Sequence, residues 1–373
     1  MYTAVTIAAT IWILQVAESV LRPLAIAVLV FFVLSAVSAR IVKLVPSRFR
    51  RGRVMARLVS IVGVGLILLA LGLLVSESIV KFSNNLETYE KNLDFLLLEV
   101  QKMFGADQTM QVMDLLRKID FRQFAISLAG STAAYASMFF VVVLYLAFVI
   151  VEAQQFGNKL SAIAATPEQE KRLHHFAGAV KQGIDDIISI QVFVGALQAV
   201  PTFMVLAIIG VDGALLWSVL VFFSSFIPTI GTIFGIGIPA LMTLLQFMSL
   251  ELFIIVFVLV GVVQLYGTNV LYPQLMRRSL SLSSLVVLIA VFAGGALWGI
   301  VGALIAVPVL TVAMIVCSQS PALRPIAIVL SADGSLPTDD APPEEGEDGP
   351  AAPRRPPPDQ EHTLRARRSG RSP

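Results

Sequence analysis

The stretch Phe226-Ile-Pro-Thr-Ile-Gly-Thr-Ile-Phe-Gly-Ile-Gly-Ile-Pro239 lies inside a long apolar run, yet it carries two prolines and three glycines. Proline removes a backbone hydrogen-bond donor and clashes with the preceding turn, and glycine loosens a helix. In lipid, each freed peptide group must find a partner in the protein or in a water-filled cavity. The stretch therefore predicts a broken or re-entrant helix that lines a path through the membrane. A glycine-packed helix crossing is the alternative.

The composition of the whole chain is that of a polytopic α-helical membrane protein. Of its 373 residues, 57% are hydrophobic and 14% are charged, whereas a soluble domain has about 25% charged residues. Apolar runs of about 20 residues, the length of a membrane-spanning helix, recur along the chain. The net charge of +2 does not indicate a nucleic-acid partner, and a lone cysteine excludes an intrachain disulfide. The first apolar run lacks a basic start, so no cleavable signal peptide is expected.

Charge patterning divides the chain into five parts. The loop at 40–57 has basic residues and no acid, which places it in the cytoplasm by the positive-inside rule. Amphipathic spacing after the third apolar run predicts helices packed on the outer side of the membrane domain or at its surface. The proline-rich, charged end is predicted to be disordered and cytoplasmic. The parts are N-terminal spans at 1–80, the amphipathic region at 81–135, a fourth span with a polar cytoplasmic loop at 136–187, a transport core at 188–320 and the tail at 321–373.

Two apolar runs, 214–247 and 283–317, are long for single crossings. If Arg277-Arg278 is cytoplasmic, the first run must enter and return on one side, with its tip at 227–231. The same reasoning makes the second run a hairpin that bends near Trp298-Gly299. Paired discontinuous helices are typical of secondary transporters, whose sites lie near the midplane. The predicted fold is therefore all-α with two broken hairpins and both termini in the cytoplasm; single crossings are the alternative.

Glu18 is the acid placed deepest in an apolar run. It stands one helical turn before Arg22. Arg22-Pro23 separates the first two apolar runs, and its proline predicts a tight hairpin or a kink there. The side chains of Glu18 and Arg22 are expected to pair and to snorkel to the membrane interface; a proton or cation site is the functional alternative. No metal is expected at His174-His175, because adjacent side chains diverge on a helix and no Cys or Glu stands at ligand spacing.

Uncharged polar side chains in the apolar core are the candidates for binding a solute. Interhelical hydrogen bonds are the alternative role for the glutamines. No metal-ligand spacing, Gly-x-Ser-x-Gly or Walker lysine is found, so neither an enzyme nor ATP-driven transport is predicted, and no cofactor is expected. The candidate path and gate residues are Gln191, Gln198, Pro228, Thr229, Gly231, Gly235, Pro239, Gln246, Gln264, Asn269 and Pro273.

Several motifs between residues 190 and 317 resemble the signature of the autoinducer-2 exporter family of bacterial transporters. In order, they are Gly210-Val-Asp-Gly-Ala-Leu-Leu-Trp217, Phe226-Ile-Pro-Thr-Ile-Gly231 with Ile238-Pro239, Asn269-Val-Leu-Tyr-Pro-Gln-Leu-Met276, Leu280-Ser-Leu-Ser-Ser-Leu-Val-Val-Leu288, and Gly295-Ala-Leu-Trp-Gly-Ile-Val-Gly302 with Val307-Pro308. The layout of the first half is similar too, so the resemblance covers most of residues 1–320. Thr229 and Ser284 depart from the family's usual residues, which bears on substrate detail.

The resemblance implies a multi-pass transporter of the bacterial inner membrane that forms a homo-oligomer in the lipid bilayer, expected to be a pentamer. It implies export of a small polar metabolite or signal, facilitative or driven by a gradient. A monovalent cation (Na+)/proton antiporter and a non-transporting membrane scaffold are the alternatives. The spans of the second half carry almost no acid, since Asp212 and Glu251 stand at predicted edges. This disfavours the antiporter unless Glu18 reaches the path.

Overall fold

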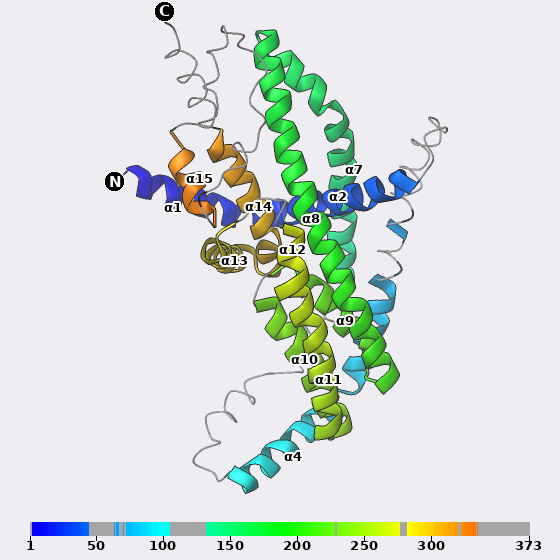
Figure 1. The fold of residues 1–373 in the computed structure, drawn as a ribbon. Helices are drawn as coiled ribbons and strands as arrows, with labels where there is room; N and C mark the ends of the chain where they lie inside the picture. The colour runs from blue at the N-terminus through cyan, green and yellow to red at the C-terminus, as the bar shows by residue number, and fades with distance from the viewer. Residues whose placement is uncertain are drawn as a thin grey trace, which may run out of the picture. The chain divides into compact units, whose positions relative to one another are not determined.

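The computed structural model of the chain is helical almost throughout (Figure 1). Within the residues that it describes, β-structure is limited to an isolated bridge between Leu282 and Ser331. The predicted all-α class is confirmed. The described residues are 2–44, 63, 65–66, 70, 72–104, 132–227, 230–276, 282–319, 322–332 and 334.

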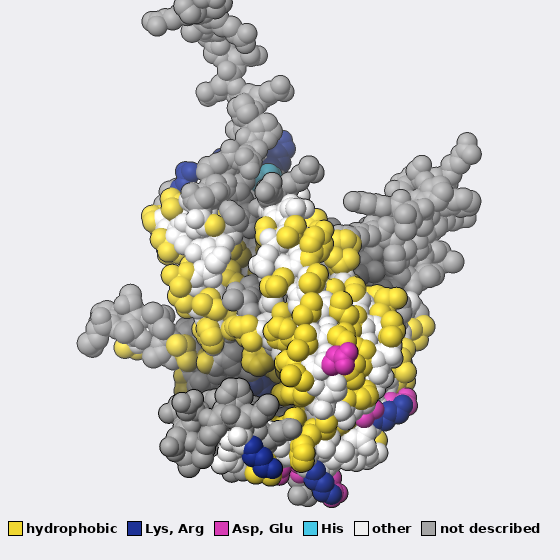
Figure 2. Space-filling model, turned by 60° about the horizontal axis from the view of Figure 1, so that its bottom comes forward, with side chains coloured by type: hydrophobic (Ala, Val, Ile, Leu, Met, Phe, Trp, Pro, Cys, Tyr) yellow, Lys and Arg dark blue, Asp and Glu magenta, His cyan; other side chains and the backbone are white. Residues whose placement is uncertain are grey.

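Six helices in these ranges are long and apolar enough to cross a membrane. Large apolar side chains lie on their outer surface; Phe140, Ile208 and Phe292 are each more than half exposed. Figure 2 shows hydrophobic side chains over much of one face. A surface of this kind suits contact with lipid, which confirms a multi-pass membrane protein. The six segments are Glu18–Ala36, Ser137–Ile163, Pro167–Ile209, Ile230–Phe247, Leu250–Met276 and Ile300–Ser318.

The N-terminal runs form α1 (Tyr2–Val16) and α2 (Glu18–Leu44), which are separated at Ala17. The tight hairpin predicted at Arg22-Pro23 is therefore wrong, because α2 continues through Pro23. Proline is tolerated near the start of a helix, because the first N–H groups there have no intrahelical partners. Pro23 is beyond these positions, but a proline inside a membrane helix is tolerated where neighbouring helices and side chains satisfy the freed backbone group, and α2 continues through it. Ala17 N still donates to the Ile13 carbonyl, which keeps α1 and α2 nearly continuous.

The amphipathic pattern after the third apolar run forms α4 (Leu86–Phe104). Leu86, Tyr89 and Leu97 are buried, whereas Phe95 is more than half exposed. The predicted amphipathic helix is thus confirmed for this part of the region. The other predictions for these parts of the chain concern residues that the structure does not describe. They are most of the basic loop at 40–57, most of the third span, residues 105–131 and the tail from residue 335.

The polar stretch at 153–187, predicted as a loop, is helical. It forms the end of α7 (Thr132–Ile163) and the start of α8 (Pro167–Ile209), and the connection is confined to the residues between them. Thr166 caps α8 by accepting a hydrogen bond from Gln169 N, with a proline at the first position and two acids in the first turn. These are strong helix-start signals. They outweigh the polar composition that suggested a loop.

The first long apolar run forms α9 (Ala214–Ser224) and α10 (Ile230–Phe247), which together we call hairpin 1. At 11 residues, α9 is about 16 Å long, too short for a hydrocarbon core of about 30 Å. The Gln246 side chain accepts from Asp212 N at 2.7 Å and donates to the Gly210 carbonyl at 3.0 Å. The run therefore begins and ends at the same place, which confirms the predicted hairpin.

Hairpin 1 is followed by a helix with an irregular end. α11 (Leu250–Tyr266) continues into a π-helical turn, η1 (Gly267–Leu271), and then into the short α12 (Tyr272–Met276). Tyr272 N donates to the Gly267 carbonyl, a span of five residues. π-Helical turns of this kind often mark functional sites.

The second long apolar run forms α13 (Ser284–Trp298) and α14 (Ile300–Ser318), which we call hairpin 2. Gly299 joins them with φ 64° and ψ −144°, a conformation open to glycine, and this confirms the predicted bend. α15 (Arg324–Leu330) then packs against α14 and α13. The prediction of disorder for 321–373 is thus wrong for its first residues, whose apolar side chains cover the base of hairpin 2.

Candidate functional site

A row of uncharged polar side chains runs between α8, hairpin 1 and the α11–η1 helix. The α8 members are separated by seven and four residues, so they lie on one face of that helix. The three glutamines are at most 1% exposed. We call this row the polar seam; its members are Gln191, Gln198 and Thr202 on α8, Thr232 on α10, Gln264 on α11 and Thr268 in η1.

Hydrogen bonds connect the seam across three elements. Gln198 Nε2 donates to the Gln264 carbonyl at 3.2 Å and to Thr268 Oγ1 at 3.3 Å. Thr268 Oγ1 lies 3.2 Å from Thr232 Oγ1 on α10. α8 is therefore joined to η1, and η1 to hairpin 1, by side chains that come from distant parts of the sequence.

Two glycines make room for the glutamine amides. A Cβ on Gly267 would lie 2.4 Å from Gln198 Nε2, and a Cβ on Gly235 would lie 2.2 Å from Gln264 Nε2. Neither separation is possible for real atoms. The amides thus lie directly against backbone, on η1 in the first case and on α10 in the second.

The tip of hairpin 1 lies against α8. A Cβ on Gly195 of α8 would be 2.6 Å from Ser225 Oγ. Within the hairpin, a Cβ on Gly231 would be 1.7 Å from the Ser224 carbonyl oxygen, so the two legs meet backbone to backbone. Pro228-Thr229, between these contacts, lies outside the described residues.

The tip also contacts hairpin 2. Ile227 and Ile230 pack against a buried apolar cluster that includes Ile187 of α8. The tip of hairpin 1 is therefore the place where α8 and both hairpins meet. The other buried members of the cluster, all from hairpin 2, are Val287, Val291, Ala303, Ala306 and Val307.

Four amide atoms of the seam are buried without a hydrogen-bond partner. They are Gln191 Nε2, Gln191 Oε1, Gln198 Oε1 and Gln264 Nε2, two donors and two acceptors. Buried polar atoms are nearly always paired, so such a group of exceptions requires an explanation. Every fully buried polar side chain in the described residues is uncharged, and no cluster of His, Cys, Asp or Glu there could hold a metal ion. The seam is thus suited to a hydrogen-bonding solute without a net charge.

The other predicted path residues lie apart from the seam. Asn269 and Pro273 are exposed, on the η1–α12 segment. Pro239 is buried in α10, and its carbonyl accepts from Thr243. Gln246 closes the base of hairpin 1.

Sequence reasoning predicted Gly235, which faces the seam, but it missed the threonines of the seam and the glycines at 195 and 267. Thr232 and Thr268 carry no local signal beyond standing near Gly231 and in the Asn269 motif. Gly195 and Gly267 are single glycines inside apolar helices, a pattern that indicates close backbone approach or packing. That signal was present and would have found them.

The base of hairpin 1 is held by Asp212. Its Oδ2 accepts from Asn85 Nδ2 at 2.8 Å and from the Tyr89 hydroxyl at 2.7 Å, and its carbonyl accepts from Trp217 Nε1 at 2.9 Å. Burial, reinforced by the bond to Asp212, raises the pKa of the Tyr89 phenol, which therefore remains a donor at neutral pH. These bonds tie α4 to the turn before α9 (Figure 1). Asp212 therefore has a structural role at the predicted membrane edge, where it connects α4 to hairpin 1.

Asp212→Ala should loosen α4 from hairpin 1. Two hydrogen bonds to a carboxylate are lost; because the Asn85 bond is exposed, we expect a cost of about 1–2 kcal/mol. Hydrogen–deuterium exchange of peptides from α4 should accelerate in detergent-solubilised protein. Lys91→Ala is the matched control, because it removes an exposed ion pair with Glu87 on the same helix; equal exchange in the two variants would contradict the role of Asp212.

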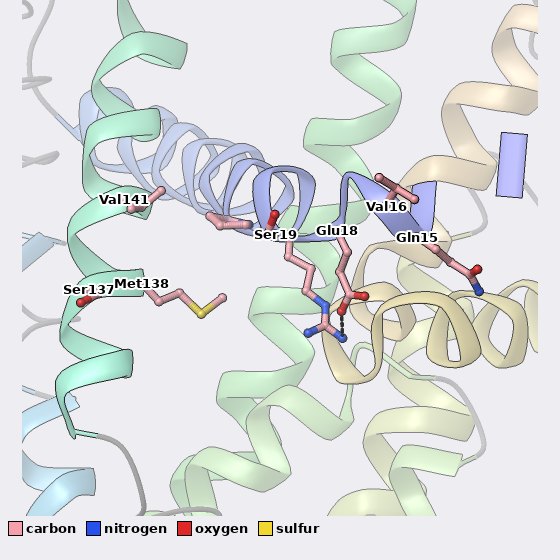
Figure 3. Close-up of a pocket in the computed structure, with 9 residues that line it drawn as sticks. Gln15, Val16, Glu18, Ser19, Ser137, Met138 and Val141 are labelled. Carbon is pink, nitrogen blue, oxygen red and sulfur yellow. Dashed lines mark ion pairs between the residues drawn. The ribbon is translucent and has the colours of Figure 1, made fainter. Parts of the chain in front are cut away.

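Glu18 lies in a different place from the seam. It forms an ion pair with Arg22 at 2.6 Å, as the spacing predicted, and both side chains are about a third exposed. A pocket of about 570 Å³ lies between the α1–α2 junction and α7 here (Figure 3). Trp298 Nε1 donates to the Leu14 carbonyl, and Arg22 lies beside Gly299. This junction therefore contacts the turn of hairpin 2.

Comparison with known proteins identifies the family. Residues 1–321 match the model of the AI-2E family transporters. The chain is 27% identical over 198 residues to the AI-2 transport protein TqsA of Escherichia coli K12, covering 52% of this chain and 56% of TqsA. It is 26% identical over 292 residues to the "Putative transport protein YhhT" of the same organism, covering 75% and 81%. A Borreliella burgdorferi protein with a similar description is 26% identical over 257 residues, 68% of this chain and 70% of that one. The chain therefore belongs to the AI-2E family of transporters.

Proposed function

We propose that this transporter moves a small polar metabolite or signal out of the cell, by facilitated diffusion or driven by a gradient, with hairpin 1 as its gate. The observation that carries the proposal is the polar seam, which has unpaired buried amide atoms and packs against hairpin 1, where Gln264 Nε2 lies against Gly235. Buried donors and acceptors without partners are costly unless another molecule or another conformation satisfies them. The name of TqsA suggests autoinducer-2 as the first solute to test.

Passage requires the tip of hairpin 1 to move away from α8 and η1. In the described conformation the glutamines of the seam are at most 1% exposed, so a solute reaches them only after such a movement. Gly231 belongs to the moving tip, the seam is what the tip uncovers, and the predicted gate residues Pro228 and Thr229 lie outside the described residues. The exposed Asn269 and Pro273 belong to the supporting helix.

We further propose a bacterial inner-membrane protein with cytoplasmic termini, assembled as a homo-oligomer and expected to be a pentamer. The basic loop after α2 supports this orientation. The cation/proton antiporter is the less favoured function. Glu18, its candidate carboxylate, is paired with Arg22 at the α1–α2 junction, and this junction contacts hairpin 2 rather than the seam. A scaffold without transport leaves the unpaired amides unexplained.

Efflux of autoinducer-2 from proteoliposomes tests the proposed function. We expect release well above that from empty liposomes, and an imposed pH gradient changes the rate only if protons are coupled. Internal pH should not respond to added sodium. Sodium-dependent proton movement without autoinducer-2 release would instead support the antiporter and direct attention to Glu18.

A further inference from the structure

The three glutamines of the polar seam differ in how far the protein itself uses them. Gln198 Nε2 donates to the Gln264 backbone carbonyl and to Thr268 Oγ1, while its Oε1 is unpaired. Gln264 Nε2 is unpaired but lies against the backbone at Gly235. Gln191 is buried to 1% exposure, and neither its donor nor its acceptor has a partner. Gln191 is therefore the residue that the described fold leaves unused.

Gln191 stands between two contacts with the tip of hairpin 1. Ile187, four residues earlier, packs in the cluster with Ile227 and Ile230 of the tip. Gly195, four residues later, lies against Ser225 of the tip. Residues separated by four lie on the same face of a helix, one turn apart. The face of α8 that carries Gln191 is thus the face that hairpin 1 covers.

We propose that the Gln191 amide recognises the transported solute at the gate, whereas Gln198 is a strut that holds η1 in place. This inference rests on the proposed function and assigns the solute contact within it. A primary amide presents one donor group and one acceptor side by side. It matches an uncharged solute group that offers an acceptor and a donor together, such as two neighbouring hydroxyls or another amide. An ion would meet no opposite charge within the seam, because all of its side chains are uncharged.

Gln191→Met and Gln198→Met form a matched pair that separates the two roles. Methionine keeps the length of glutamine and removes both polar groups. Without solute, Gln191→Met should raise the melting temperature, because an unsatisfied buried amide becomes apolar. Gln198→Met should lower it, because its two donor contacts are lost. We expect shifts of roughly 2–4 °C in each direction.

Solute binding and efflux, in contrast, should be lost when Gln191 is replaced. Autoinducer-2 should raise the melting temperature of the wild-type protein by ligand linkage, and it should leave that of Gln191→Met unchanged. Efflux by Gln191→Met should fall at least about tenfold. A site that can no longer form its hydrogen bonds to the solute favours that solute less, by a factor of at least this size. Gly237→Ala, which lies outside the seam where a Cβ meets nothing within 4 Å, should keep the solute-induced shift.

The outcomes distinguish this inference from the proposed function. If wild-type protein exports autoinducer-2 and Gln191→Met exports it equally well, the assignment of Gln191 is overturned while the exporter stands. If wild-type protein neither binds nor moves autoinducer-2, that solute is wrong for the proposed function. The melting temperatures without solute then decide the claim about Gln191: a rise supports an amide that the fold leaves unused, and a fall shows a structural role.

Discussion

Gly231→Ala should abolish most of the flux and destabilise the protein, although it adds a single methyl group. The new Cβ would lie 1.7 Å from the Ser224 carbonyl oxygen. Overpacking costs about 1–3 kcal/mol in well-packed interiors. We expect the upper end here, because the obstructing atom is backbone and no change of rotamer moves it. The legs of hairpin 1 must separate, which displaces the tip from α8 and the Gly235 contact from Gln264.

Gly237→Ala is the control for this prediction. It lies on the same helix, and a Cβ there would meet nothing within 4 Å. It should retain flux and gain up to about 1 kcal/mol from better helix propensity. Thermal unfolding and proteoliposome efflux should be measured on both proteins. Equal stability of the two variants would show that the legs do not meet as described; reduced stability with undiminished flux per folded molecule would remove hairpin 1 as the gate.

Both hairpins could be predicted from the sequence because their signals are local. Each run is too long for one crossing and has glycine or proline near its middle, where a turn favours these residues. The same reasoning placed the second bend at Gly299, where the backbone adopts a positive φ. It failed to place the hairpin expected at Arg22-Pro23, because a proline inside a membrane helix is tolerated and α2 continues through it.

The polar seam could be predicted only in part. The glutamines stood out as polar residues in apolar runs, but their partners are far away in sequence: Gln198 and Thr268 are 70 residues apart, and Thr232 and Thr268 are 36 apart. Those pairings depend on how helices pack, which no local pattern encodes. Asn269 was selected for its neighbours in the sequence, and it is exposed. The π-helical turn that contains it alters which residues face the core.

If hairpin 1 moves away from η1 during transport, a reversible covalent link between the two should stop transport. The hydroxyl oxygens of Thr232 and Thr268 are 3.2 Å apart across this interface, so their side chains approach as a disulfide requires. Cysteines at both positions should therefore form a disulfide under mild oxidation. Cys317, the one cysteine of the chain, is replaced by serine so that no other thiol takes part.

The measurement is solute efflux from proteoliposomes containing Thr232→Cys/Thr268→Cys/Cys317→Ser protein, before and after oxidation and again after reduction. Efflux should stop when the disulfide forms and should return on reduction. Each single-cysteine variant should be unaffected by the oxidant. Full efflux from protein shown to be cross-linked would mean that hairpin 1 stays on η1 during transport, and it would contradict the gate.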